Sequence, residues 1–352
     1  MLHPALLRTI MDVSYLSWCL RNNDFDSRTY ASLAKEAENM GYYGFFSVEG
    51  TDRKALPHLI TGNIRSAFIN NAAAALATSK IKLGTSIVSI YSRTPLATSF
   101  EAATLNELSN GRFILGVGVG GPWLVEKGYG YPLDRPAVRM KEFLTIVKQA
   151  LSGAKVDFQG EFYKVVDVRL EQLHPSAPPV LMAGLNPAML KVGGMLADGV
   201  ILNMFPTEAL EFAREKISEG AEKAGRNPRD VKLYVLAACG VSDEPTVVNS
   251  LKTGIAFYCH ISTHHKFLAY AGLQSYAEKI QRVWSEQGPE KAAEEVNDLL
   301  LERLTLGYTP EKIAYRCKEY LSKGAYPLIY PHFDKENGKQ KLLRLMHALT
   351  KA

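Results

Sequence analysis

The chain has 352 residues, a length that suits one large α/β barrel or two ordinary domains, and 47% of them are hydrophobic, which is enough for a full core. The net charge of +5 is small and the basic residues are scattered, which argues against a nucleic-acid partner. No apolar run approaches the length of a membrane span, and the first residues lack an apolar stretch of signal-peptide length. We therefore expect a protein that uses neither nucleic acid nor membrane as a partner.

The cysteines point to a reducing compartment. Cys19, Cys239, Cys259 and Cys317 are far apart and contain no CxxC pair. This spacing is typical of reduced thiols and not of a disulfide framework. The sequence thus predicts a cytoplasmic protein.

Strand-like and helix-like segments alternate from one end of the chain to the other. In chain order, the predicted strands are 13–18, 44–48, 81–88, 112–117, 179–183, 199–203, 231–239 and 326–330. The predicted helices are 28–40, 67–78, 95–108, 136–152, 187–196, 208–224 and a last one from about residue 337, with a β-hairpin at 159–170.

This alternation favours a single (β/α)₈ TIM barrel over residues 1–352, with a doubly wound open sheet as the structural alternative. The segment between the seventh and eighth strands is too long for an ordinary loop. Residues 255–306 are aromatic and helical in pattern, and we expect them to form an insertion that caps the carboxyl-terminal mouth of the barrel. Active sites lie at that end in this architecture.

A glycine-rich loop follows the fourth predicted strand. Asn110-Gly111 predicts a turn before the strand, and Gly116, Gly118 and Gly120 then remove side chains from its end. Backbone stripped in this way can approach a flat or phosphorylated ligand, although a plain tight loop between strand and helix has the same composition. The spacing is neither that of a dinucleotide-binding GxGxxG motif nor that of a P-loop.

Five motifs in this order resemble the bacterial-luciferase-like superfamily, between about residues 13 and 203. They are Ile81-x-Leu83-Gly84-Thr85; Arg93-Thr94-Pro95; Gly111-Arg112-Phe113-x-Leu115-Gly116-Val117-Gly118; Arg135-Pro136-x-x-Arg139-Met140-Lys141-Glu142-Phe143; and Pro179-Val180-Leu181-Met182-Ala183-Gly184 with Leu196-Ala197-Asp198-Gly199-Val200.

The resemblance implies a (β/α)₈ barrel, a small-molecule substrate and a homodimer or higher homo-oligomer. The superfamily has one branch that uses FMN, often with oxygen, and another that uses the deazaflavin coenzyme F420 and moves hydrides. The segments 187–191 and 197–203 make this chain more similar to the second branch, particularly to methylenetetrahydromethanopterin reductases. We therefore expect a coenzyme F420-dependent oxidoreductase, with an FMN-dependent monooxygenase as the alternative. A barrel that binds a ligand without catalysis is a third possibility.

The same resemblance implies where the cofactor ring lies. Members of the deazaflavin branch have a non-prolyl cis peptide beneath the central ring, which would fall at Ser86-Ile87 here, with Val88 directly after it. Sequence alone is equally compatible with an ordinary trans strand at this place.

A second strand-to-helix turn, at residues 184–188, is suited to a phosphate. Asn186 is placed as the N-cap and Pro187 as the first helical residue. A capped helix that binds nothing has the same sequence pattern, but the resemblance favours a phosphate at this helix N-terminus. The backbone N–H groups expected to bind it are those of Gly184, Leu185, Ala188 and Met189.

Glu49 ends the second predicted strand and is the candidate catalytic residue. Relatives usually have His after the acidic residue, whereas Gly50 stands here, so a histidine-based proton relay is in doubt. Glu49 remains a candidate acid or base, or a group that orients the substrate. A solvated carboxylate at the end of a strand is the alternative.

Histidines and tryptophans supply the last candidates. His260 and His264 have the i,i+4 spacing of a metal pair, with His265 next to them. Without a third ligand of known geometry we predict no metal site there and interpret them as partly buried residues of the insertion, or as substrate contacts. Trp18 and Trp123 could stack on a ring at the barrel mouth or fill the core.

Overall fold

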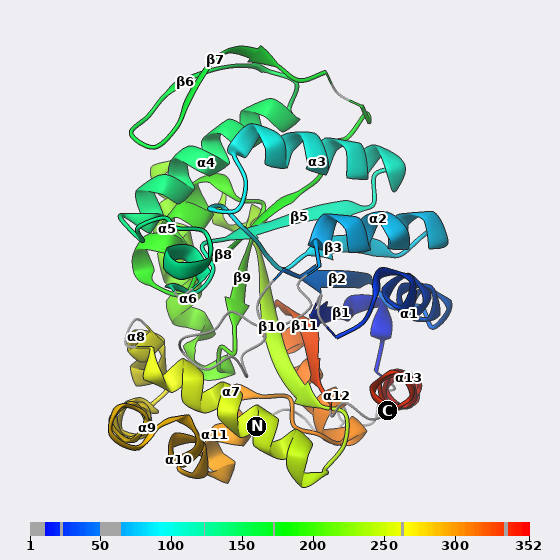
Figure 1. The fold of residues 1–352 in the computed structure, drawn as a ribbon, viewed down its shortest axis with the longest axis vertical. Coiled ribbons are helices and arrows are strands. Elements are labelled where there is room, and N and C mark those ends of the chain that lie inside the picture. Colours follow the sequence, from blue (N-terminus) through cyan, green and yellow to red (C-terminus); the bar gives the residue numbers. More distant parts are fainter. Residues whose placement is uncertain are drawn as a thin grey trace.

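The computed structural model describes residues 11–21, 24–49, 65–122, 124–171, 173–261, 264–333 and 337–352. Its centre is a parallel β-barrel (Figure 1). The barrel strands are β1 (Ser17–Arg21), β2 (Gly44–Val48), β3 (Lys82–Thr85), β4 (Val88–Ser89), β5 (Phe113–Gly118), β8 (Val180–Ala183), β9 (Gly199–Asn203), β10 (Lys232–Gly240) and β11 (Ala325–His332).

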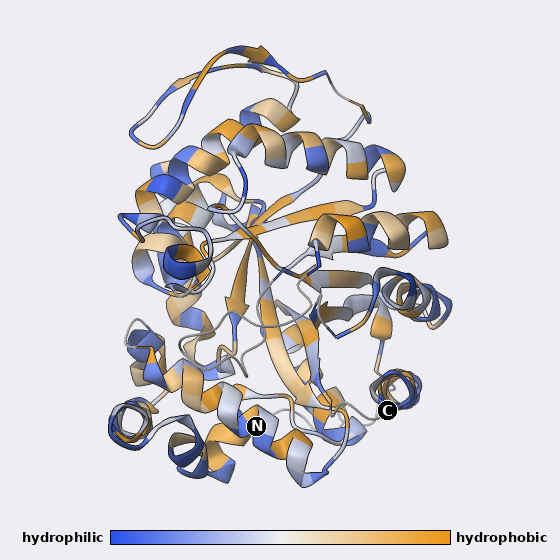
Figure 2. Cartoon of the chain, viewed as in Figure 1, coloured by the Kyte–Doolittle hydropathy of each residue, from blue (hydrophilic) through white to orange (hydrophobic). Residues whose placement is uncertain are grey.

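The barrel closes because β3 pairs with both β2 and β5, so the sheet has no free edge there. β4 continues the line of β3 and also pairs with β5 in parallel. Counted in this way the barrel has eight strands, as the alternation in the sequence predicted. Its strands are hydrophobic and largely buried, as expected of parallel strands covered on their outer face by helices (Figure 2).

Helices surround the barrel, and an antiparallel hairpin lies outside them against α4 (Figure 1). The hairpin strands are β6 (Lys155–Gln159) and β7 (Lys164–Arg169). The helices are α1 (Ser27–Asn39), α2 (Ala67–Ala77), α3 (Pro95–Leu108), α4 (Pro136–Leu151), α5 (Pro187–Leu196), α6 (Leu210–Lys223), α7 (Pro245–His260), α8 (His265–Tyr270), α9 (Gln274–Gln287), α10 (Pro289–Glu294), α11 (Asp298–Leu304), α12 (Pro310–Ser322) and α13 (Gly338–Leu349).

The first strand lies later than predicted. Residues 13–18 were expected to be extended, but Val13–Tyr15 form a 3₁₀ turn, and β1 begins at Ser17. The carboxylate of Asp12 accepts a hydrogen bond of 3.0 Å from the N–H of Ser14 and so caps the turn. A local side-chain cap therefore overrides the strand propensity of this segment.

The segment between β10 and β11 is helical and begins earlier than the predicted boundary. α7 starts at Pro245, whose ring suits the first helical position, and Ile255 lies inside this helix. α7 to α11 gather on one side of the molecule (Figure 1), and α12 then returns to pack on β11. No described helix is both long and apolar enough to cross a membrane.

Candidate functional site at the carboxyl ends of the strands

Glu49 follows β2 directly, at the carboxyl end of the barrel, where it was predicted. Its carboxylate forms an ion pair of 2.9 Å with the guanidinium of Arg93, and its second oxygen accepts the N–H of Ala67, which begins α2, at 3.3 Å. Both oxygens of Glu49 are thus engaged, and the side chain is only 11% exposed. The structure gives Glu49 a definite orientation, which a solvated strand end would lack.

Arg93 connects this carboxylate to a second one. Its Nε donates to Glu101 of α3 at 2.9 Å, and its guanidinium lies over the ring of Phe68, 5.2 Å from the ring centre. Burial alone would lower the pKa of Arg93, but the hydrogen bond and charge of Glu49 outweigh burial and raise it. Burial, together with the charge of Glu49, raises the pKa of Glu101 despite Arg93. The cluster therefore holds a permanently charged arginine between two carboxyl groups.

The peptide bond between Ser86 and Ile87 is cis, as the family resemblance implied. It separates β3 from β4, and the carbonyl of Ile87 accepts the backbone N–H of Glu49 at 3.3 Å. Gly118 lies against Ile87, because a Cβ on this glycine would come within 2.8 Å of the Ile87 side chain. The cis peptide, Glu49 and the end of β5 are therefore neighbours at the carboxyl end of the barrel.

The remaining predicted residues of this region are explained in part by packing. A Cβ on Gly116 would come within 2.0 Å of the Thr85 carbonyl oxygen, so close strand contact requires glycine there without any ligand. Gly120 has a positive φ of 88°, which glycine adopts readily. Ser86 and Val88 are both buried. Burial raises the pKa of the Cys19 thiol to about 12, an effect that the neighbouring Ser86 hydroxyl partly offsets.

The N-terminus of α5 has the predicted cap, but fewer unused donors than expected. Asn186 accepts the N–H of Met189 at 3.0 Å, and the N–H of Gly184 donates to the Ile201 carbonyl at 3.2 Å. The predictions that Met189 and Gly184 offer N–H groups to a phosphate are therefore wrong, because a side-chain cap and the sheet use them. Within the described residues, the N–H groups of Leu185 and Ala188 have no acceptor.

Sequence reasoning missed a cluster at the ends of β1 and β11. The guanidinium of Arg21 lies over the ring of Tyr330, 5.2 Å from its centre, and 3.5 Å from Nδ1 of His332. Ser250 of α7 is 2.9 Å from the same nitrogen. Because arginine only donates, Nδ1 of His332 is an acceptor. The position of these polar residues was the signal that could have indicated the cluster, since Arg21 ends β1 and His332 ends β11.

A second missed group joins α7 to β9. The amide of Asn203, the last residue of β9, donates a hydrogen bond to the hydroxyl of Tyr258. The Tyr258 ring is stacked on the ring of His264, with centres 4.9 Å apart and planes 17° from parallel. Together with Ser250, these contacts place α7 along the carboxyl ends of β9 and β11, above the barrel mouth.

The histidines of this segment have separate partners. His264 has Nδ1 3.1 Å from the Tyr258 carbonyl, and His265 has Nε2 2.7 Å from the Cys259 carbonyl. His260 is stacked on Trp284, with ring centres 5.0 Å apart, and burial lowers its pKa. The described residues contain no group of three or more His, Cys, Asp or Glu side chains arranged to hold a metal ion.

Trp18 does not stack at the mouth. Its ring is fully buried and meets Tyr42 edge to face, with centres 5.6 Å apart, while the Tyr42 hydroxyl bonds to the Met346 carbonyl of α13. Trp18 is therefore core filling between the barrel and its outer helices. Trp123 and Gly50 lie outside the described residues.

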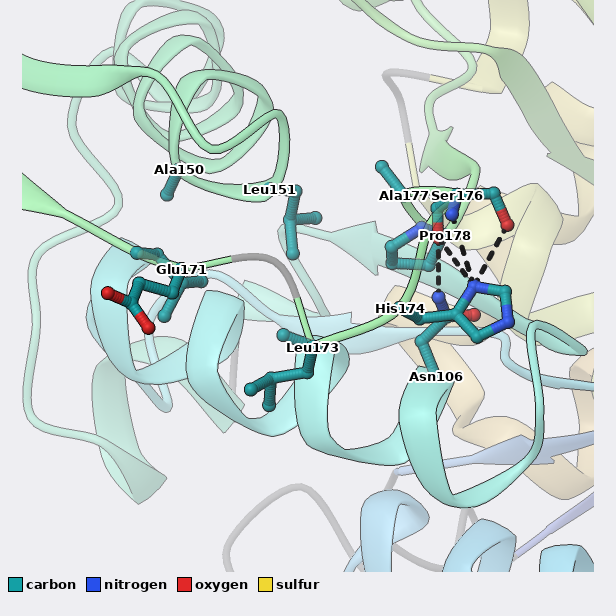
Figure 3. Close-up of a pocket in the computed structure, with 11 residues that line it drawn as sticks. Asn106, Ala150, Leu151, Glu171, Leu173, His174, Ser176, Ala177 and Pro178 are labelled. Atoms are coloured by element: carbon teal, nitrogen blue, oxygen red, sulfur yellow. Dashed lines mark hydrogen bonds between the residues drawn. The ribbon is translucent and has the colours of Figure 1, made fainter.

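A pocket at the opposite end of the barrel is small, and some of its lining residues hydrogen-bond with one another (Figure 3). It lies where α3 and α4 end and β8 begins, which is the amino end of the strands. Asn106 donates to the Ser176 carbonyl at 2.8 Å, and His174 accepts the N–H of Ser176 at 3.1 Å. These polar groups satisfy one another, in contrast to those at the mouth.

These features define a (β/α)₈ barrel whose polar site lies at the carboxyl ends of its strands, the usual location for catalysis in this fold. The sequence profile of the family described as "Luciferase-like monooxygenase" matches residues 17–326. The chain belongs to this family.

Two curated relatives match about three quarters of the chain. The 5,10-methylenetetrahydromethanopterin reductase of Methanopyrus kandleri is 29% identical over 273 residues, which are 73% of this chain and 78% of that protein. The F420-dependent glucose-6-phosphate dehydrogenase of Amycolatopsis mediterranei is 26% identical over 274 residues, with 74% of this chain and 76% of that protein covered.

Solved structures agree on the fold. The coenzyme F420-dependent tetrahydromethanopterin reductase from Methanopyrus kandleri superposes with a TM-score of 0.76 at 24% identity, over 97% of this chain and 98% of that chain. A long-chain alkane monooxygenase superposes with a TM-score of 0.66 at 14% identity, over 97% and 92%. At these identities the likeness supports the barrel architecture and not a particular substrate.

Proposed function

We propose that this protein is a coenzyme F420-dependent oxidoreductase that transfers a hydride between the cofactor and a small organic substrate. The observation that carries the proposal is the match, over about three quarters of the chain, to a methylenetetrahydromethanopterin reductase and to enzymes whose names include F420. The cofactor supplies the hydride chemistry when bound, and the protein supplies binding, orientation and exclusion of water.

The residues present fit a phosphorylated cofactor. The N–H groups of Leu185 and Ala188 have no acceptor within the described residues and lie at the N-terminus of α5, which carries positive partial charge. Ala188 is exposed, so a ligand can reach this helix end. We propose that the turn from Gly184 to Ala188 holds the phosphate through Leu185 and Ala188, with Asn186 keeping the helix start in place. Gly184 contributes close packing, since a Cβ there would meet Met189 at 2.8 Å.

The loops around the cis peptide would hold the ring. Ser86, Ile87 and Val88 lie beside Glu49 and the end of β5, where Gly118 leaves room for the Ile87 side chain. We propose that this surface contacts one face of the ring. Gly116 and Gly120 support it by strand packing and by loop conformation.

Glu49 is proposed as the protein's proton-accepting or proton-donating group at the mouth. Its orientation is fixed by Arg93 and by the N–H of Ala67, so its carboxylate does not have to be ordered when a substrate arrives. Across the mouth, Asn203 and Tyr258 offer hydrogen-bonding groups to the substrate side of the site. α7 would at the same time exclude water from above.

An FMN-dependent monooxygenase is the second candidate, because the family is named for monooxygenases and an alkane monooxygenase shares the fold. Equilibrium titration of the purified protein with F420 and with FMN, followed by cofactor fluorescence at one ionic strength, separates the two. We expect F420 to bind at least about tenfold more tightly, which corresponds to about 1.4 kcal/mol. Tighter binding of FMN would replace the proposal by the second candidate.

A further inference from the structure

One arginine near the barrel mouth has no carboxylate partner among the described residues. Arg139 of α4 lies among three aromatic rings, with its Cζ 4.2 Å from the ring centre of Phe162, 4.8 Å from that of Tyr91 and 5.6 Å from that of Tyr163. Its Nε is buried without a hydrogen-bond partner among the described residues. No carboxylate of the described chain lies within ion-pair distance of it.

Tyr91, which lies beside Arg139, also has a buried hydrogen-bond donor without an acceptor among the described residues. Its side chain is only 5% exposed, and within the described structure its hydroxyl is buried and unpartnered. Burial raises the pKa of Tyr91 despite the charge and the side-chain contact of Arg139, so the phenol stays protonated and its proton is available to an acceptor. Buried donors of this kind are uncommon in folded proteins and call for a missing acceptor. Here two of them, one cationic, lie side by side.

The neighbouring Arg135, at the N-cap of α4, has the carboxylate partners that Arg139 lacks among the described residues. Arg135 lies one helical turn earlier and also stacks on Phe162, 5.3 Å from its centre. It differs from Arg139 in that it pairs with two carboxylates, those of Asp134 and Glu161. Within the described residues, one arginine thus has carboxylate counter-charges and the other has none, although both contact the same ring.

The hairpin fixes this cluster in position. Glu142 of α4 accepts the N–H groups of Glu161, Phe162 and Tyr163 at 2.7, 2.9 and 3.2 Å, so it binds the hairpin turn to the helix. Arg139 and Glu142 belong to the motif at residues 135–143 that the proposed hydride chemistry leaves unexplained. The motif builds a rigid aromatic frame around a guanidinium, with the helix and the hairpin on either side.

The cluster adjoins the barrel mouth. The Tyr163 hydroxyl donates to the Ile90 carbonyl at 3.3 Å, and Tyr91 follows Ile90 directly. Two residues later Arg93 meets Glu49. A ligand seated at the mouth therefore needs to extend only across the loop of residues 89–93 to reach Arg139, whose side chain is half-buried and not sealed from solvent.

We propose that Arg139 and Tyr91 form an anion-binding subsite at the rim of the mouth, which takes a carboxylate or phosphate group of the bound ligand. The guanidinium supplies charge and several N–H donors, and the phenol adds one O–H donor. The aromatic rings cover part of the guanidinium, and partial burial of this kind strengthens charge-assisted hydrogen bonds. The assignment of the anion to the cofactor or to the substrate rests on the proposed function, whereas the anion site itself does not.

Calorimetric titration with inorganic phosphate tests the site without cofactor. All proteins carry Ala188→Asp, which removes the N-terminus of α5 as a competing site. We expect Arg139→Met to weaken phosphate binding at least about tenfold, as for loss of charge-assisted hydrogen bonds, and Tyr91→Phe to weaken it less. Arg135→Met is the matched control, with the same charge change on the same helix, and should stay within about twofold of its parent.

Two outcomes overturn the proposal. In the first, Arg139→Met leaves phosphate affinity unchanged or lowers it no more than Arg135→Met does. In the second, the parent protein does not bind phosphate. If Arg139→Met does not fold, Tyr91→Phe decides, since it must weaken phosphate binding more than Arg135→Met does.

A parallel F420 titration of wild-type and Arg139→Met protein then locates the anion. Weaker F420 binding assigns it to the cofactor. Unchanged F420 binding, with phosphate binding lost, assigns it to the substrate. If F420 binds neither protein, the proposed function fails while the anion site still stands on the phosphate result.

Discussion

The two ends of the barrel treat their buried polar groups differently. At the amino end, Arg112 is 8% exposed and uses its guanidinium in five hydrogen bonds, to the Ser109, Ile81, Ala75 and Thr78 carbonyls and the Thr78 hydroxyl. At the carboxyl end, within the described residues, Arg139 and Tyr91 keep buried donors without acceptors, and Leu185 and Ala188 keep unused N–H groups.

We propose that this difference separates residues that stabilise the fold from residues that bind a ligand. A buried donor without an acceptor costs free energy, so a chain keeps it only where something else is gained. The network of Arg112 has no such donors, and the small pocket beside it is lined in part by Asn106, His174 and Ser176, which hydrogen-bond with one another. We therefore assign Arg112 to the stability of the fold and propose that the donors of Arg139, Tyr91, Leu185 and Ala188, unpartnered among the described residues, bind a ligand.

The largest expected effect belongs to Glu49. If it accepts or donates a proton in the reaction, Glu49→Gln should lower kcat with the physiological substrate by roughly 10²–10⁴-fold, the range for a lost general acid or base. Cofactor affinity should stay close to that of the wild type, because the proposed phosphate donors lie at the N-terminus of α5, away from Glu49. Steady-state kinetics and a cofactor titration measure the two quantities.

Glu101→Gln is the matched control for Glu49. Glu101 also pairs with Arg93, but it is 42% exposed and lies on α3. Its loss should leave kcat within a fewfold of the wild type. If Glu49→Gln and the wild type had equal kcat values, Glu49 would have no role in proton transfer and would serve only to position Arg93.

The next effect is on stability at the amino end. Arg112→Met removes five hydrogen bonds and leaves buried carbonyl oxygens without a donor. We expect the free energy of unfolding to fall by about 3 kcal/mol or more. Urea unfolding followed by circular dichroism measures it, with the exposed Arg135→Met as a control that should change by less than about 1 kcal/mol. A loss below about 1 kcal/mol in Arg112→Met would contradict the structural role.

The sequence was sufficient for the architecture because it depends on patterns that repeat. Apolar runs with intervening amphipathic helices predicted a barrel of eight strands, and Asn186 followed by Pro187 predicted a capped helix start. The family resemblance implied the cis bond at Ser86-Ile87, which no local pattern indicates. The boundary of β1 failed because one side chain, Asp12, redirected its segment into a 3₁₀ turn.

The site was less predictable because it depends on contacts between distant segments. The N–H of Gly184 was expected to be unused, but the sheet partner Ile201 accepts it. Tyr258 and Asn203 are 55 residues apart in sequence, and only the packing of α7 brings them together. The unpaired state of Arg139 depends on where Asp134 and Glu161 lie, and both face Arg135 instead.

Whether the carboxyl end of the barrel holds the cofactor, as we propose, can be tested at Ala188. Ala188→Asp places a negative charge where we propose that a phosphate binds, while an acidic residue in a first helical turn suits the helix itself. Ala188→Asn has nearly the same shape without the charge, and Asn106→Ala alters the amino-end pocket.

The measurement is the dissociation constant of F420 for these three variants and the wild type. We expect Ala188→Asp to weaken binding at least about tenfold, through repulsion between like charges close together, whereas Ala188→Asn and Asn106→Ala should bind nearly as well as the wild type. Unchanged affinity in Ala188→Asp, or an equal loss in Asn106→Ala, would contradict it.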